Sequence, residues 1–135
     1  MMATRDGDPR MAQYMLIIPD DYDAWEAKTP QERRAIYAEH ETFATRLAQG
    51  GHRVTAGAEL TLPRTARTVR SGPAGITVTD GPYTESVEQL SGFYLIESED
   101  LRDLEEACGI LAEHFPVEIR EVGPAVADEP AEAQR

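Results

Sequence analysis

His40 is a histidine that would face the interior of the protein. It follows Ile36 by four residues and precedes Phe43 by three, and these spacings place all three side chains on one face of a helix. A neutral imidazole on such an apolar face can accept a proton near neutral pH, so His40 is a candidate general base. The alternative is a core histidine that hydrogen-bonds one neighbour and has no chemical role.

Asp80 is the candidate carboxylate partner of His40. An aspartate beside an imidazole fixes its tautomer and raises its basicity. Asp80 is followed by Gly81 and Pro82, and this tripeptide is also a natural turn in which the aspartate bonds nearby backbone amides. We expect the turn to aim Asp80 at His40, with a purely structural turn as the alternative.

Three more polar side chains are candidate substrate-binding residues. Tyr83 and Tyr94 can hydrogen-bond a polar ligand, although aromatic residues of strands also pack in cores. Glu85, with Glu88 three residues later, adds carboxylates to an acidic connector. Such acids could hold a divalent metal but usually form a solvated surface. Because no phosphate-binding, nucleophile-elbow or metal-binding motif occurs in the sequence, we expect neither a metal nor a cofactor.

Two other groups of residues allow two interpretations each. Residues 20–28 are expected to form a polar loop before the first long helix, and Trp25 in this loop would form a pocket wall or a lid over the core. Four arginines could attract a carboxylate-bearing substrate, or could simply be the exposed positions of edge strands. They are Arg53, Arg64, Arg67 and Arg70.

Apolar patterning predicts the elements that position these residues. We expect strands at residues 13–18, 52–62, 92–97 and 117–122, helices at 29–50 and 100–116, and a hairpin formed by 65–70 and 76–79. Apart from the inserted hairpin, the order is β-α-β-β-α-β. This order predicts a ferredoxin-like α+β fold, with both helices on one face of an antiparallel sheet. The other face would be apolar and uncovered, so we expect a homodimer that packs sheet against sheet.

Local signals mark particular positions in these elements. Thr29, Pro30 and Glu32 predict a capping box at the start of the first helix, and Gly50-Gly51 predicts a left-handed end. Gly57 predicts a bulge or a close approach in the strand at 52–62. Asp100 predicts the N-cap of the second helix, whose buried stripe would hold Leu101, Leu104, Cys108 and Leu111.

Composition limits the partners and the compartment. The chain has 135 residues and a formal net charge of −12, which predicts one domain, at residues 11–122, and argues against direct binding to nucleic acid. The segments 1–10 and 123–135 contain little apolar material, and we expect them to be disordered tails. A single cysteine and the lack of a long apolar stretch favour a cytoplasmic protein that does not enter a membrane.

The stretch TDGPYTESVEQLSGFYLIE, at residues 79–97, resembles the DGPF-type branch of the YCII-related family. The segments QYMLII, TPQERRAIYAEHETFATRL and VTAGAELTLP are also similar to that family, so the resemblance covers about residues 13–122. It implies a dimeric α+β barrel, similar in architecture to muconolactone isomerase, and a His and Asp active centre whose matching positions are His40 and Asp80. The chain departs from the family's motif at Tyr83, where phenylalanine is usual.

These observations favour one function and leave a second open. The first is a cofactor-independent enzyme of the isomerase or lyase type, which transfers a proton on a small organic acid with the pair His40 and Asp80. The second is a non-catalytic dimer that binds a ligand or regulates a protein partner through the acidic segment 85–106.

Overall fold

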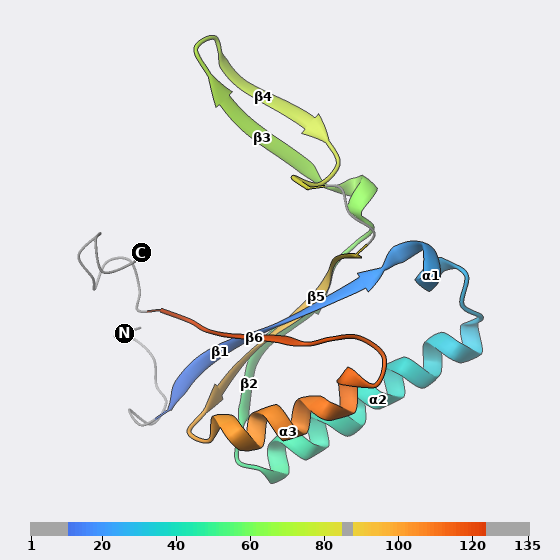
Figure 1. Ribbon diagram of the computed structural model, residues 1–135, viewed down its shortest axis with the longest axis vertical. Coiled ribbons are helices and arrows are strands. Elements are labelled where there is room, and N and C mark those ends of the chain that lie inside the picture. The colour runs from blue at the N-terminus through green and yellow to red at the C-terminus, as the bar shows by residue number, and fades with distance from the viewer. Residues whose placement is uncertain (1–10, 85–87, 124–135) are drawn as a thin grey trace.

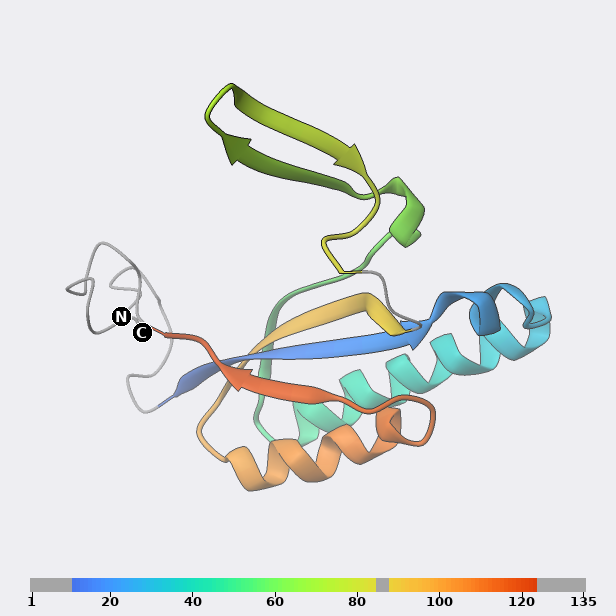
Figure 2. The ribbon, with the colours of Figure 1, turned by 45° about the horizontal axis from the view of Figure 1, so that its top comes forward.

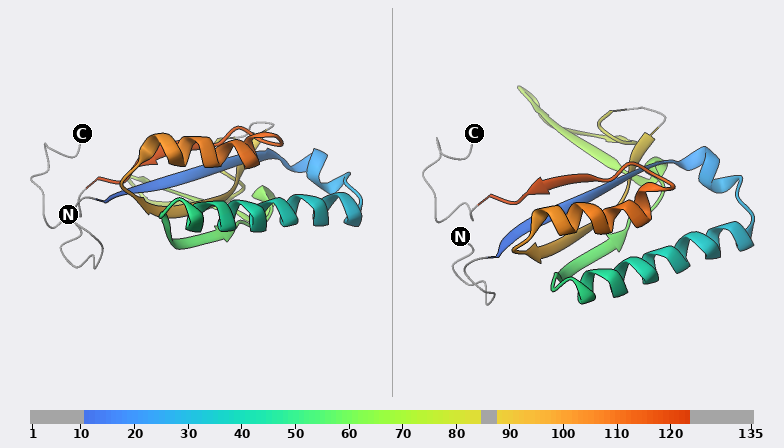
Figure 3. Two further views of the ribbon diagram at one scale, coloured as in Figure 1. Left: turned by 90° about the horizontal axis from the view of Figure 1, so that it is seen from below. Right: turned by 60° about the horizontal axis from the view of Figure 1, so that its bottom comes forward.

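The computed structural model describes residues 11–84 and 88–123 as a four-stranded antiparallel sheet, a separate hairpin and helices. The sheet order is β2-β5-β1-β6, which is the order of a ferredoxin-like fold and confirms the predicted fold class. The helices α2 and α3 cover one face of this sheet (Figures 1 and 3). The elements are β1 (Ala12–Asp21), α1 (Tyr22–Glu26), α2 (Pro30–Gln49), β2 (Arg53–Glu59), the 3-10 turn η1 (Pro63–Thr65), β3 (Arg67–Gly72), β4 (Gly75–Asp80), β5 (Glu88–Ser98), α3 (Leu101–Ala112) and β6 (Glu118–Glu121).

The long helix α2 begins at a complete capping box. The Glu32 amide donates to Thr29 Oγ1 over 3.1 Å, and the Thr29 amide donates to Glu32 Oε1 over 2.8 Å. Pro30 occupies the first turn, where its missing amide proton costs nothing. The chain leaves the helix through Gly51 at φ 81°, a conformation that favours glycine. The sequence predicted each of these features.

The first strand extends beyond Pro19, where the sequence pattern predicted its end. The strand β6 pairs only with the Tyr14–Ile17 part of β1. At Pro19 the ladder to β5 shifts register, and β1 has no second neighbouring strand there among the described residues. The missing amide of Pro19 therefore leaves no ladder bond unmade.

A short helix replaces the loop that we predicted after β1. The Asp21 carboxylate caps this helix, α1, by accepting from the amides of Asp23 and Ala24. The prediction failed because α1 is a single turn with no buried residue, so the sequence carries no apolar periodicity to show it.

The core lies between the sheet and the two helices. Its fully buried side chains come from β1, α2, β5 and α3, which shows that these elements pack as one layer on another. They include Leu16, Phe43, Leu47, Ile96, Leu104 and Leu111. Leu101, which we predicted on the buried stripe of α3, is 39% exposed because it is the first residue of that helix.

The strands β3 and β4 form a hairpin that pairs with no other described strand. It projects from the sheet on the side away from the helices (Figure 2). Its register places Val69 opposite Val78 and Ser71 opposite Ile76, so one face of the hairpin is apolar. Val69, Ile76 and Val78 are 59%, 71% and 49% exposed.

Candidate active site

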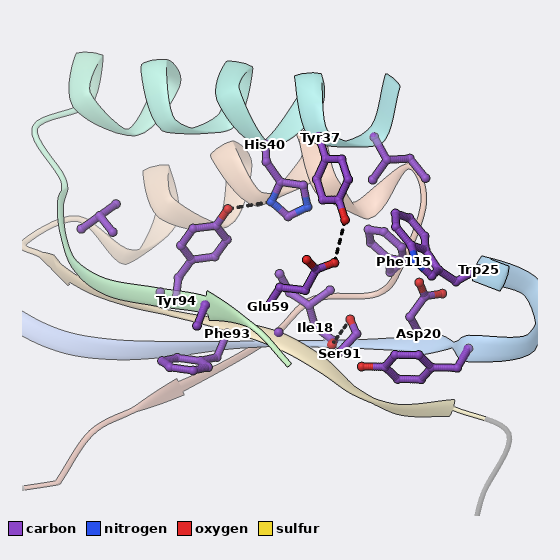
Figure 4. Close-up of a pocket in the computed structure, with 16 residues that line it drawn as sticks. Ile18, Asp20, Trp25, Tyr37, His40, Glu59, Ser91, Phe93, Tyr94 and Phe115 are labelled. Atoms are coloured by element: carbon purple, nitrogen blue, oxygen red, sulfur yellow. Dashed lines mark hydrogen bonds between the residues drawn. The ribbon is translucent and has the colours of Figure 1, made fainter. Parts of the chain in front are cut away.

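A cavity of about 410 Å³ lies between α2 and the sheet. It is partly open to solvent, and most of its wall comes from β1, α1, α2, β2 and β5 (Figure 4). Most of the lining is apolar or aromatic, which is the usual character of a small-molecule site. The polar side chains in the wall are Asp20, Tyr22, Tyr37, His40, Glu59, Ser91 and Tyr94.

His40 and Tyr94 form the closest polar pair in this wall. His40 Nδ1 lies 2.6 Å from the Tyr94 hydroxyl, and the two rings stack with centroids 5.9 Å apart. Burial lowers the pKa of His40, opposed by the charges of Glu59 and Glu39, and burial raises the pKa of Tyr94. The imidazole is therefore neutral and the phenol protonated at pH 7.

Glu59 is the carboxylate that the structure places near His40. Its Oε2 accepts a 2.8 Å hydrogen bond from the Tyr37 hydroxyl, and its charge favours the protonated form of His40. The second ring nitrogen of His40 lies on the side toward Tyr37 (Figure 4). Glu59 was not predicted as a site residue, because the end of an edge strand carries no signal of a pocket in the sequence.

Gly57 lets β2 pass directly over the Tyr94 ring. A Cβ atom at this position would lie 2.9 Å from Tyr94 Cδ1 and 3.2 Å from the Phe93 carbonyl oxygen. The sequence suggested a bulge or a close approach here. The close approach is present, and a register shift occurs just before it, between Val54 and Ala56. The absence of a side chain at Gly57 thus leaves room for the phenol that contacts His40.

The structure does not bring Asp80 to His40. Asp80 ends β4 on the hairpin, with its side chain 83% exposed and its carboxylate 3.5 Å from Arg67, and it is not part of the cavity wall. Tyr83 is also outside the cavity. It is 79% exposed, and the Arg70 guanidinium lies over its ring at 5.6 Å. The hairpin holds these residues away because its strands pair only with each other.

The other predicted residues divide between the cavity and the rest of the chain. Tyr94 and Trp25 line the cavity, and Trp25 also packs against the core. Glu85 lies outside the described residues. None of the four arginines lines the cavity; Arg53 pairs with Glu97 at 3.4 Å, and Arg64 pairs with Glu26 at 3.6 Å.

A second cluster, around His52, resembles a nucleophilic triad but lacks access. His52 Nε2 lies 2.7 Å from Asp103 Oδ2, and His52 Nδ1 lies 2.9 Å from Ser98 Oγ. Ser98 is only 1% exposed, and its Oγ also accepts from the Asp100 amide. Arg46 completes the cluster with two hydrogen bonds to Asp103. A substrate cannot reach this serine, so the cluster is a structural junction between α2, the turn before β2, β5 and α3.

Two negative findings concern only the described residues. They contain no group of three or more His, Cys, Asp or Glu side chains arranged to hold a metal ion. None of their helices is long and apolar enough to cross a membrane.

A comparison with protein families identifies the family of this chain. The family model described as YCII-related domain matches residues 12–114. No curated protein matches the chain.

Proposed function

Because this chain belongs to the YCII-related domain family over residues 12–114, and because its cavity holds a neutral histidine, we propose that it is a small-molecule enzyme of the isomerase or lyase type. His40 is the proton-transferring base. The observation that carries this proposal is the 2.6 Å contact between His40 Nδ1 and the Tyr94 hydroxyl in the wall of the cavity. A base in a partly buried site, with its pKa below the working pH, is ready to accept a proton.

The contact with Tyr94 leaves His40 Nε2 as the reacting atom. When Nδ1–H donates to the Tyr94 oxygen, Nε2 carries the lone pair. Transfer of a proton from an acidic C–H or O–H of the ligand to Nε2 makes an imidazolium and leaves the electron pair on the ligand. The ligand regains a proton at a second position from the same nitrogen, which gives an isomer.

Glu59 has the role in this proposal that the sequence assigned to Asp80. Its negative charge favours the protonated form of His40, so it stabilises the imidazolium during the transfer. Its hydrogen bond from Tyr37 fixes the carboxylate in place. The pairing of His40 with Asp80 is not needed for this mechanism.

Hydrogen exchange tests proton transfer without knowledge of the product. The protein is incubated in D₂O with a panel of small ketones, lactones, amino ketones and unsaturated acids, and NMR follows the replacement of C–H by C–D. We expect exchange with the wild type, loss of about 10²–10⁴-fold in rate for His40→Asn, and a smaller loss for Tyr94→Phe, which keeps the ring but not the hydroxyl.

Glu41→Gln is the matched control, because Glu41 is an exposed neighbour on the same helix that does not line the cavity. It should leave exchange unchanged. Equal exchange by His40→Asn and wild type would overturn the proposal. Binding of a panel compound without exchange would favour the second candidate function, a ligand-binding or regulatory module.

We also propose that the chain acts as a homodimer. The sheet leaves Met15, Ile17, Phe93 and Leu95 on the face opposite the helices, since Met15 pairs with Leu95 and Ile17 with Phe93. All four are only partly buried in the single chain. The hairpin, which also exposes apolar side chains, projects on the same side of the sheet (Figure 2). Two unpartnered apolar surfaces on one side of the molecule favour a second copy as their cover.

A further inference from the structure

The charge of the cavity wall selects among the ligands that fit it. The wall contains two carboxylates, Asp20 and Glu59, and no lysine or arginine among the described residues. An organic acid, which the sequence led us to expect, would meet like charges in a partly enclosed space of reduced dielectric, where repulsion is stronger than in water. A positively charged ligand would meet two partners.

We infer that the cavity binds a small organic ammonium compound, whose charged group lies between Asp20 and Glu59 against tyrosine rings. This inference names the ligand class for the proposed enzyme site and depends on that function only in placing the ligand in this cavity. A primary ammonium has three donors, and the two carboxylates come from strands on opposite sides of β5. Figure 4 shows both side chains turned into the space beneath α2.

The two carboxylates act on the same part of the cavity. Burial first, and then the charges of Asp20 and Glu59, raise the pKa of the Tyr22 hydroxyl. The phenol of Tyr37 also has a raised pKa, through burial and its hydrogen bond to Glu59. Both rings are therefore neutral at pH 7, and their negative faces are available to attract a cation.

The charge of Arg33 acts on Tyr37, but its guanidinium is held outside the cavity by other partners. Its guanidinium lies over the Trp25 ring at 5.3 Å. It donates to the backbone carbonyls of Trp25 and Glu26 and does not line the cavity. It does cover one face of Trp25, so the cation site depends on the tyrosines and carboxylates rather than on the tryptophan.

Three probes that share one ring and differ in charge test whether the cavity selects ligands by charge. Cyclohexylammonium, cyclohexanol and cyclohexanecarboxylate share a ring that is small enough for the cavity. Trp25 is the only tryptophan of the chain and lines the cavity, so its fluorescence reports binding, with calorimetry as the second measurement. We expect cyclohexylammonium to bind at least about tenfold more tightly than the carboxylate, with the alcohol between them.

Neutralising variants test which groups select the charge. Glu59→Gln should weaken the binding of cyclohexylammonium about five- to tenfold, since a charged hydrogen bond is lost. It should leave the affinity for cyclohexanol unchanged, since the shape of the cavity is kept. Glu41→Gln removes a carboxylate from the exposed surface and should change the affinity by less than about twofold. Circular dichroism confirms that each variant is folded.

Three results would overturn the inference. They are equal or tighter binding of the carboxylate, no effect of Glu59→Gln on the ammonium, and no ammonium binding at tens of millimolar. His40→Asn separates this inference from the proposed function. This variant should lose hydrogen exchange while it keeps the preference for the ammonium probe, so either proposal can fail alone.

Discussion

At the scale of single residues, burial decides which histidine can do chemistry. His40 and His52 both contact a hydroxyl, but only His40 stands in the wall of a cavity. His52 is 7% exposed and contacts polar side chains with both ring nitrogens. The first is available to a ligand, and the second joins elements of the fold.

The junction around His52 predicts how stability depends on pH. Hydrogen bonds from Arg46 and His52 lower the pKa of Asp103 from 3.8 to about 2. The ionised carboxylate therefore stabilises the fold above about pH 4, and this contribution is lost as the pH falls toward 2. Asp103→Asn should lower the melting temperature at pH 7, and its difference from wild type should shrink progressively below about pH 4.

Scanning calorimetry between pH 2 and 7 measures this difference. The control is Glu113→Gln, which removes one exposed carboxylate at the other end of α3 and should change the melting temperature by no more than about 1 °C. A constant difference between Asp103→Asn and wild type across this range would contradict the assignment.

Residue types alone predicted part of the site. The helical spacing placed His40 on the inner face of α2, and Tyr94 was recognised as a ligand-binding candidate; both line the cavity. Asp80 was chosen for its turn, but the turn belongs to a hairpin that leaves the sheet. Glu59 approaches His40 only through the pairing of β2 with β5, and such long-range contacts are not contained in local spacing.

At the scale of elements, the contact of β2 with β5 holds the site together. Gly57→Ala would place a methyl group against Tyr94 and the Phe93 carbonyl, both part of β5. Overpacking of this kind costs about 1–3 kcal/mol. We expect a lower melting temperature because of this overpacking. We also expect slower C–H exchange of the panel compounds, because the displaced Tyr94 ring loses its contact with His40.

Gly109→Ala is the matched control within α3. Nothing lies within 4 Å of a Cβ atom built at Gly109, so alanine should stabilise the helix by about 0.5–1 kcal/mol. Chemical denaturation measures both variants. If Gly57→Ala also raised the free energy of unfolding, Gly57 would not be a packing constraint.

Local signals predicted the starts of the two long helices but not the end of the first strand. The capping box at Thr29 and the N-cap at Asp100 were read correctly because each bond spans three residues. The end of β1 was predicted wrongly. The strand can continue through Pro19 only because β6 stops pairing before that residue, and this depends on packing between segments far apart in the chain.

At the scale of the whole molecule, the hairpin exposes apolar side chains that no other described part of the chain covers. A two-stranded hairpin is marginally stable alone, and this one exposes Val69, Ile76 and Val78. Residues 61–80 hold three arginines and one acid, while the remainder of the chain holds 10 basic and 24 acidic residues. A basic arm and an acidic body complement each other between two copies.

Replacing the three apolar hairpin residues tests this association. Val69→Thr, Ile76→Thr and Val78→Thr together keep β-branched residues in the strands but remove the apolar face. Sedimentation velocity should show a dimer at micromolar concentration for the wild type, and a dimer at least about tenfold weaker for the triple variant.

The opposite face of the hairpin supplies the control. Thr68→Ser and Thr77→Ser alter the polar side and should leave the dimer intact. A monomeric wild type, or a triple variant that associates as tightly as wild type, would count against a second copy as the cover of this surface.

The separation of the hairpin from the cavity also bears on how such a protein changes over evolutionary time. Because β3 and β4 contribute no residue to the cavity wall, we expect substitutions there to be selected independently of those around His40. A lineage could alter its assembly by drift in one segment and retain its chemistry, or acquire a new substrate with its quaternary contacts preserved.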